Sequence, residues 1–312
     1  MEKLVVIVGP TGTGKTDLAL ALAKKFDGEI ISADSRQIYI GMDIGTGKID
    51  PSSKMLGVRK EKERWVVDGV PIHLYDIITP EKTFSVATYQ QEALRIIGGI
   101  QKENELPILV GGTGLYIRAV VEGLKIPKVA PNKKLREQLE SKSISSLVRE
   151  LEKVDPETAG KIDKANLRRI IRALEVYHQT GESFSKLKGK FKVNFDALKI
   201  GLTSDRDFLY HRVDARIDTW IKTGFVEEVK ELFDKGYKEA SALKTLGYRQ
   251  IVMYLEGKVS LEEAIQRTKF GHHNYIRQQA TWFRKETGIS WFNIAALDFR
   301  RQIFDKVQSW LN

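Results

Sequence analysis

The N-terminal part of the chain alternates short apolar runs with longer stretches in which apolar residues recur at helical spacing. The run at residues 4–8 is apolar throughout and rich in β-branched residues. An unbroken run of this kind is typical of a strand buried on both faces of a parallel sheet. The pattern predicts strands at 4–8, 29–33 and 107–110 and helices at 16–25 and 89–100. Because strands and helices alternate, we predict a doubly wound α/β fold with a parallel sheet.

The pattern changes after Gly123, where strand signals become scarce. Apolar residues now recur at helical spacing, at Leu135, Leu139, Leu147, Leu151, Ile170, Ile171 and Leu174. We therefore predict a helical insertion at 125–195 within a core formed by residues 1–124 and 196–312. The run at 197–202 predicts a return strand to the core sheet, and the remainder of the chain is predicted to be mostly helical.

The composition is that of an ordinary globular protein and favours a polyanionic partner. Of 312 residues, 51 are Lys or Arg and 41 are Asp or Glu, which gives a formal net charge of +10. The chain has no cysteine, which excludes disulfides and thiolate metal sites. Because no apolar run is long enough to span a bilayer, we expect a cytoplasmic protein without a membrane partner.

The strongest chemical signal lies directly after the first predicted strand. It is the pattern G-x-x-x-x-G-K-[ST], formed by Gly9, Pro10, Thr11, Gly12, Thr13, Gly14, Lys15 and Thr16. Between a buried strand and a helix, such a loop turns backbone N–H groups and the helix N-terminus toward phosphate oxygens. Lys15 supplies positive charge, and the Thr16 hydroxyl can hold Mg²⁺. We therefore predict a site for a diphosphate or triphosphate together with Mg²⁺.

The carboxylate of an ordinary P-loop NTPase is missing from its usual place. In those proteins a buried strand ends in an Asp that helps to hold Mg²⁺, but the strand at 107–110 runs into Gly111 and Gly112. A carboxylate appears instead at Asp34, after the strand at 29–33, which we predict to neighbour the P-loop strand. Asp34 is therefore either a base beside a leaving diphosphate or the cap of the turn that follows it.

A set of sequence blocks then occurs in the order typical of one family. The blocks are the loop at 9–16, Asp34-Ser35-Arg36-Gln37-Ile38-Tyr39, Gly45-Thr46-Gly47-Lys48, Gly111-Gly112-Thr113-Gly114-Leu115-Tyr116, Asn166 with Arg168-Arg169 and Arg172-Ala173-Leu174-Glu175-Val176, Gly247-Tyr248-Arg249-Gln250, and Arg277-Gln278 with Thr281-Trp282. From residue 4 to about residue 292 the chain resembles the bacterial tRNA dimethylallyltransferase family.

The resemblance implies a fold and a reaction. The fold is a P-loop-type core with a helical insertion and a helical C-terminal region. The reaction requires Mg²⁺ and uses dimethylallyl diphosphate as donor and tRNA as acceptor. It places a dimethylallyl group on the exocyclic amine of the adenosine 3′-adjacent to the anticodon, and the insertion is the tRNA-binding part.

Three residues are then the candidates for catalysis. The adenine amine is a poor nucleophile because its lone pair is delocalised into the ring, so Asp34 is our candidate for the base that takes its proton. Thr113 is placed to orient the amine or a phosphate, the alternative being a turn threonine that bonds its own backbone. Arg216 is the candidate that stabilises the leaving diphosphate. Arg212 stays open in its place, as does an ion pair of either arginine with a neighbouring aspartate.

Two basic regions are the candidates for contact with RNA. Residues 267–285 combine basic and aromatic side chains without an acidic one, a composition that suits single-stranded RNA loops. The insertion carries arginines that the resemblance places against the anticodon stem-loop, with a solvated helix face as the alternative. The residues assigned to tRNA are Asp34, Ser35, Arg36, Gln37, Thr113, Arg136, Arg168, Arg169, Arg172, Arg249, Gln250, Arg277 and Gln278.

Other features have simpler interpretations. Trp282 and Phe283 are expected to belong at least in part to the core. The pair His272 and His273 does not predict a metal site, because no third ligand is spaced for one. The alternating lysines from Lys186 to Lys192 are expected on a solvated loop.

Two other functions stay open at this point. An adenylate prenyltransferase or a small-molecule P-loop kinase shares the phosphate loop and Asp34 but needs neither basic region. An ATP-driven RNA-binding switch needs the acidic strand end that is missing here. We expect a monomer, because the tRNA partner is large and the sequence shows no dimer seam.

Overall fold

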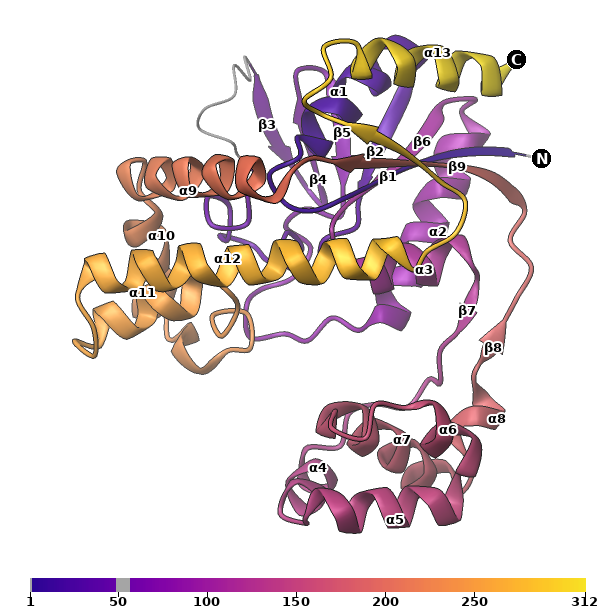
Figure 1. Ribbon diagram of the computed structural model, residues 1–312, viewed down its shortest axis with the longest axis vertical. Coiled ribbons are helices and arrows are strands. Elements are labelled where there is room, and N and C mark those ends of the chain that lie inside the picture. Colours follow the sequence, from indigo (N-terminus) through magenta and orange to yellow (C-terminus); the bar gives the residue numbers. More distant parts are fainter. Residues whose placement is uncertain (1, 49–56) are drawn as a thin grey trace. The chain divides into compact units, whose positions relative to one another are not determined.

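The computed structural model describes residues 2–48 and 57–312 and divides into two compact units (Figure 1). Unit 1 contains Met1–Ile117 and Asn194–Asn312, and unit 2 is Arg118–Val193. The two units have separate hydrophobic cores and are described one at a time.

Within the described residues, unit 1 is built on a sheet of eight strands in the order β10-β9-β1-β6-β2-β5-β4-β3. The strands are β1 (Glu2–Val8), β2 (Gly28–Ser32), β3 (Val58–Glu61), β4 (Arg64–Val67), β5 (Val70–His73), β6 (Leu106–Val110), β9 (Phe195–Thr203) and β10 (Ile289–Asn293). Pairs from β10 through β5 are parallel, and only β3 and β4 add antiparallel pairs at one edge. The mostly parallel sheet confirms the predicted fold class.

The predicted neighbour of the P-loop strand is wrong. β6 pairs with both β1 and β2 and therefore separates them. The connection from β1 through the first helix to β2 skips one position, and β6, which is buried along its whole length, fills it. The edge strands β3 to β5 and the terminal strand β10 were not predicted.

Helices cover both faces of the sheet, with α1 (Lys15–Phe26) and α13 (Phe299–Leu311) on one face and α2 (Val86–Lys102) on the other (Figure 1). Alternate side chains of β1 explain the two layers. Val5 and Ile7 belong to the cluster that contains Leu18 of α1 and Ile303 of α13. A strand with both faces covered needs apolar residues at every position, which is why β1 reads as one continuous run.

The C-terminal half of unit 1 adds helices that lie beside the ends of the strands. They are α9 (Arg206–Lys222), α10 (Phe225–Asp234), the short helix η1 (Tyr237–Glu239), α11 (Tyr248–Leu255) and α12 (Leu261–Arg284), while α3 (Gly114–Val121) follows β6. Their shared core includes Trp220, Phe225, Tyr248 and Ile276, all at most 2% exposed. This cluster holds α9 and α12 side by side, and both helices contribute to the site described below.

Unit 2 is helical, with a pair of two-residue strands at its base. Its elements are β7 (Leu124–Lys125), α4 (Lys133–Glu140), α5 (Ile144–Val154), α6 (Pro156–Lys161), α7 (Leu167–Thr180), α8 (Phe184–Leu187) and β8 (Gly189–Lys190). Of the apolar residues that predicted helices here, all but Leu135 belong to its buried core, and Leu135 packs against that core. One charged residue, Glu175 of α7, is completely buried among them.

Candidate active site

The phosphate-binding loop connects β1 to α1. Gly9 has a φ of +141°, and a Cβ there would lie 2.4 Å from the carbonyl oxygen of Leu202 in the adjacent strand β9. Both the conformation and the space therefore require glycine. Gly14, at φ +79°, directly precedes the first turn of α1, so the N-terminus of that helix opens into the loop.

The loop forms one wall of a cavity of about 360 Å³ at the carboxyl edge of the sheet. Residues from several elements meet there, namely Thr11, Gly12, Gly14, Lys15 and Thr16 of the loop, Asp34, Arg36 and Gln37 after β2, Gly111 and Gly112 after β6, Arg212 and Arg216 of α9, and His272, Tyr275 and Gln279 of α12. The cavity thus collects Asp34, Arg216 and five of the eight predicted loop residues, although β6 lies between β1 and β2. Thr113 is not among the lining residues.

Two cations, Lys15 and Arg216, line this cavity. The Lys15 ammonium donates to the carbonyl oxygen of Pro10 at 2.9 Å, and Arg216 donates from Nη2 to Thr11 Oγ1 at 2.7 Å. Burial, together with the positive charge of Arg216, lowers the pKa of Lys15 to about 8, although Asp34 opposes the shift. A bound anion would favour the charged form of Lys15 and would therefore be attracted to this site.

The two candidate arginines of α9, Arg212 and Arg216, differ in their surroundings. Arg216 is half-buried and bonds the phosphate loop, whereas Arg212 is exposed at the cavity mouth. The two aspartates nearest to them in the sequence have other partners, because Asp214 pairs with His273 at 2.8 Å and Asp218 pairs with Lys269 at 2.7 Å.

Asp34 takes part in its own turn and also lines the cavity. Its Oδ1 accepts the backbone N–H of Arg36 at 2.9 Å, as the capping alternative requires. Thr113 supports the same turn, because its hydroxyl oxygen accepts the backbone N–H of Ser35 at 3.1 Å. Thr113 therefore contacts the Asp34 turn and not merely its own backbone.

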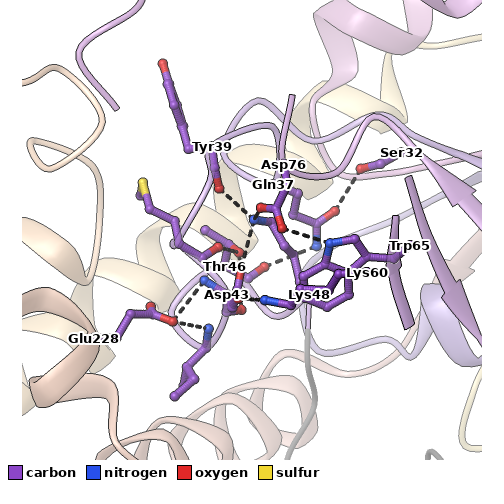
Figure 2. Close-up of polar contacts among 12 residues, drawn as sticks. Ser32, Gln37, Tyr39, Asp43, Thr46, Lys48, Lys60, Trp65, Asp76 and Glu228 are labelled. Atoms are coloured by element: carbon purple, nitrogen blue, oxygen red, sulfur yellow. Dashed lines mark hydrogen bonds and ion pairs between the residues drawn. The ribbon is translucent and has the colours of Figure 1, made fainter. Parts of the chain in front are cut away.

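The loop that continues from Asp34 is held by a buried polar network (Figure 2). Lys48, which is 1% exposed, donates to the carbonyl oxygen of Tyr39 at 2.6 Å and to Asp43 at 3.0 Å, and it also pairs with Asp76. Glu228 accepts the backbone N–H of Asp43 and that of its neighbour Ile44. This support fixes the Gly45-Thr46-Gly47 segment, which lines the cavity.

Helix α12 closes the cavity with aromatic and neutral groups. The Arg36 guanidinium lies 5.1 Å from the centre of the Tyr275 ring. Burial, with the Asp34 charge, raises the pKa of Tyr275 to about 12. Burial lowers the pKa of His272 to about 3, and its Nδ1–H donates to the Thr268 carbonyl oxygen, so this imidazole is neutral at pH 7.

Gln279 of α12 also lines the cavity, and the sequence analysis did not select it. Gln279 is 5% exposed, whereas Gln278, which we assigned to tRNA, is exposed. The signal was present in the sequence, since Gln279 follows His272 and Ile276 along the buried stripe of α12. A buried polar side chain on such a stripe indicates a specific hydrogen-bond partner.

Several residues assigned to tRNA have partners inside the protein. Gln250 is buried, and its side-chain oxygen accepts the backbone N–H of Gly247 at 2.9 Å, which caps α11. Arg136 and Arg172 both bond the buried Glu175, each at 2.7 Å. Gln250 therefore caps α11 in this structure, and its contact with RNA stays a prediction.

The remaining basic candidates are exposed. They are Arg168 and Arg169 in unit 2 and Arg249 and Arg277 in unit 1. Phe283 is buried, as expected, while the half-buried Trp282 lies against Gly114, where a Cβ would come within 2.1 Å of its indole nitrogen.

No group of three His, Cys, Asp or Glu side chains within residues 2–48 and 57–312 is arranged to hold a metal ion. Over the same described residues, no helix has both the length and the apolar character needed to cross a membrane.

Comparison with known proteins gives consistent similarities. The sequence model of the IPP transferase family matches residues 37–286. The chain is 45% identical over 299 residues to a tRNA dimethylallyltransferase of Carboxydothermus hydrogenoformans, covering 94% of this chain and 92% of the relative. It is 44% identical over 312 residues to that of Thermomicrobium roseum, covering 98% and 91%.

Solved structures show the same similarity. A full-length tRNA isopentenylpyrophosphate transferase from Bacillus halodurans superimposes with a TM-score of 0.72 at 38% identity, covering 99% of this chain and 96% of that one. A eukaryotic dimethylallyltransferase acting on tRNA superimposes with a TM-score of 0.75 at 26% identity, covering 98% and 78%.

Proposed function

This chain belongs to the IPP transferase family, and from that premise we propose how its cavity carries out the transfer of a dimethylallyl group to tRNA. It is a tRNA dimethylallyltransferase whose acceptor is tRNA. The observation that carries the mechanism is that the phosphate loop and Asp34 line one cavity, while β6 between them ends in glycines. The cavity thus places a carboxylate beside a phosphate site without the strand-end acid of an NTPase.

The donor in our proposal is dimethylallyl diphosphate, with its diphosphate in the loop at 9–16. The backbone N–H groups of the loop and the N-terminus of α1 face the oxygens of the anion. Lys15 and Arg216 supply two positive charges, and these count most when the diphosphate leaves and its charge grows.

A divalent cation fits this site, and we propose Mg²⁺. The Thr16 hydroxyl lines the cavity, and Mg²⁺ commonly combines one protein oxygen with phosphate oxygens and water. The lack of a cage of acidic side chains among the described residues agrees with that mode of binding. When bound, the ion would neutralise part of the charge on the leaving diphosphate.

The acceptor reaction is a displacement at the allylic carbon. A bond forms between the adenine exocyclic nitrogen and that carbon, the carbon–oxygen bond to diphosphate breaks, and a proton leaves the nitrogen. We assign the proton to Asp34, whose Oδ1 is held by the Arg36 N–H so that the carboxylate is oriented. Thr113 orients the Asp34 turn through Ser35.

The proposed RNA-contacting residues lie in both units. In unit 1 they are Ser35, Arg36 and Gln37 beside the cavity, with Arg249, Arg277 and Gln278. In unit 2 they are the exposed Arg168 and Arg169, together with Arg136 and Arg172, whose side chains stay 38% and 29% exposed. Exposed guanidinium groups suit backbone phosphates.

The test uses an allylic diphosphate labelled in its dimethylallyl group. Purified protein with Mg²⁺ is expected to label tRNA, and digestion should place the label on the adenosine 3′-adjacent to the anticodon. Label on free AMP, or no label in either acceptor, contradicts the proposal. Light scattering of the same sample is expected to give a monomer.

A further inference from the structure

Gln279 of α12 is a buried amide with two separate backbone partners. Its Oε1 accepts the N–H of Thr11 at 2.8 Å, and its Nε2 donates to the carbonyl oxygen of Gly112 at 3.0 Å. Thr11 belongs to the loop after β1, and Gly112 follows β6. One side chain therefore ties together the ends of two adjacent strands at the cavity.

The fit is specific for an amide. A primary amide offers one acceptor and two donors at fixed positions, whereas a carboxylate only accepts and a hydrocarbon does neither. The bond to Gly112 is buried and the bond to Thr11 is partly buried, and Gln279 itself is 5% exposed. Loss of the amide therefore leaves the Gly112 carbonyl without its partner in a buried place and releases the Thr11 N–H at the cavity.

The backbone at Gly112 is shaped for this contact. A Cβ on Gly112 would lie 2.2 Å from the Gln279 Nε2, so any larger residue displaces the amide. Gly112 is required for lack of space beside the amide and not for its backbone conformation. The hydrogen bond therefore depends on both residues, on Gly112 for the space and on Gln279 for the amide.

Thr11 is also the residue that receives Arg216. The Thr11 hydroxyl accepts from the Arg216 guanidinium at 2.7 Å, while the Thr11 backbone N–H is held by Gln279. Gln279 therefore holds the backbone of Thr11, and the side chain of Thr11 in turn holds Arg216.

We propose that Gln279 is a positioning residue of the donor site, which holds Thr11 and, through it, Arg216 in the arrangement that binds the diphosphate. The inference rests on the proposed function, because it assumes that the diphosphate binds in the loop at 9–16. Gln279 acts through Thr11 and need not touch the substrate.

The test measures pyrophosphate binding by calorimetry with Gln279→Met and Gln279→Glu. Gln279→Met keeps the length of the side chain and removes both hydrogen bonds, so pyrophosphate is expected to bind at least about fivefold more weakly, which corresponds to about 1 kcal/mol for one net hydrogen bond. The KM for dimethylallyl diphosphate should rise with it, while tRNA affinity stays within about twofold.

Gln279→Glu gives a readout that a general loss of packing would not move. The ionised carboxylate can accept from Thr11 but repels the Gly112 carbonyl oxygen, whereas the protonated acid again offers one donor and one acceptor. The ratio of variant to wild-type dissociation constants should therefore fall toward one as the pH is lowered from about 8 to about 5.

Gln266→Met is the matched control, because Gln266 lies on the same helix and is exposed. It should bind pyrophosphate like the wild type. If folded Gln279→Met binds within about twofold of wild type, or if the Gln279→Glu ratio does not change with pH, the proposal is wrong. A wild-type protein that binds no pyrophosphate contradicts the proposed function as well, and the two failures are thereby told apart.

Discussion

Asp34 can act in two ways, because the same carboxylate caps a turn and faces the donor cavity. Asp34→Asn separates them. The amide oxygen can still accept the Arg36 N–H, so the turn and the substrate sites should survive. It cannot take a proton, so the single-turnover rate of transfer should fall by about 10²–10⁴ at saturating donor.

The control for this prediction is tRNA affinity measured on the same preparation. If Asp34 only caps its turn, stability falls by about 0.5–2 kcal/mol at most and the chemistry stays near normal. A variant that binds tRNA normally and transfers within about threefold of wild type would remove Asp34 as the base.

Lys15 gives a prediction on pH. Its pKa in the free protein is about 8, and a bound anion raises that pKa because it favours the charged form. Pyrophosphate therefore binds best below that pH, and its affinity should fall by up to about tenfold per pH unit above it. Lys15→Arg stays charged, so the ratio of its affinity to that of wild type should rise with pH across this range.

The measurement is calorimetry from pH 7 to 10 in buffers of different ionisation heat. The wild type should take up a proton on binding in the alkaline part of the range, and Lys15→Arg should take up less. Equal proton uptake by both proteins would assign the titration to pyrophosphate itself.

Some of the site residues could be predicted from the sequence, and others could not. The phosphate loop was readable because its spacing and its place after a buried strand reflect local backbone geometry. The partners of Gln279 were not readable, because Thr11 and Gly112 come from distant parts of the chain. The cap made by Gln250 is local, since it bonds the N–H of Gly247 three residues earlier, but the burial of its side chain depends on how α11 packs.

At the scale of elements, α7 depends on the buried Glu175. Burial disfavours its charge, but hydrogen bonds from Arg136, the Asn132 N–H and Arg172 outweigh that effect and lower its pKa to about 2. Because the folded-state pKa lies below the ordinary value of 4.5, the stabilisation is complete above that value and is lost as the pH falls toward 2.

Glu175→Gln should therefore destabilise unit 2 by about 3 kcal/mol, the low end for a broken buried pair because both arginines stay partly exposed. The measurement is the free energy of unfolding of the full protein at pH 7 and at pH 3. The loss should be smaller at pH 3. Glu152→Gln, which breaks an exposed pair with Lys164, should cost less than about 1 kcal/mol.

Elements were predicted where burial dictates the pattern. The strands β1, β6 and β9 lie in the interior of the sheet, so their apolar runs identify them. β3 is mostly exposed at the sheet edge and carries charged residues, which gives no strand signal. β10 is also an edge strand and only partly buried, and it was overlooked for the same reason.

For the whole molecule, the family and the mostly parallel α/β fold were predictable, but the strand order was not. The insertion of β6 between β1 and β2 is a property of the complete sheet, and it places Gly111 and Gly112 between the phosphate loop and Asp34. The cavity still forms, because all three parallel strands end at the same edge.

Charge at the start of α7 gives the last prediction. Arg168 and Arg169 are exposed in the first turn of this helix, which has no acidic residue there. Positive side chains at a helix N-terminus oppose the helix dipole and cost about 0.3–1 kcal/mol each. Their charge therefore does not stabilise the start of this helix, and it suits the contact with backbone phosphates proposed above.

The double variant Arg168→Ala/Arg169→Ala should therefore move stability and binding in opposite directions. Unfolding should require as much denaturant as in the wild type or more, because alanine favours helices and the unfavourable charges are gone. Affinity for tRNA should fall, and the slope of log K against log salt should become shallower by up to about 0.9 per lost contact. The control is Lys186→Ala/Lys192→Ala, which removes two exposed charges from the same unit and should leave the slope nearly unchanged. If both double variants change the slope equally, unit 2 attracts RNA only by its general charge and the two arginines have no specific part in binding.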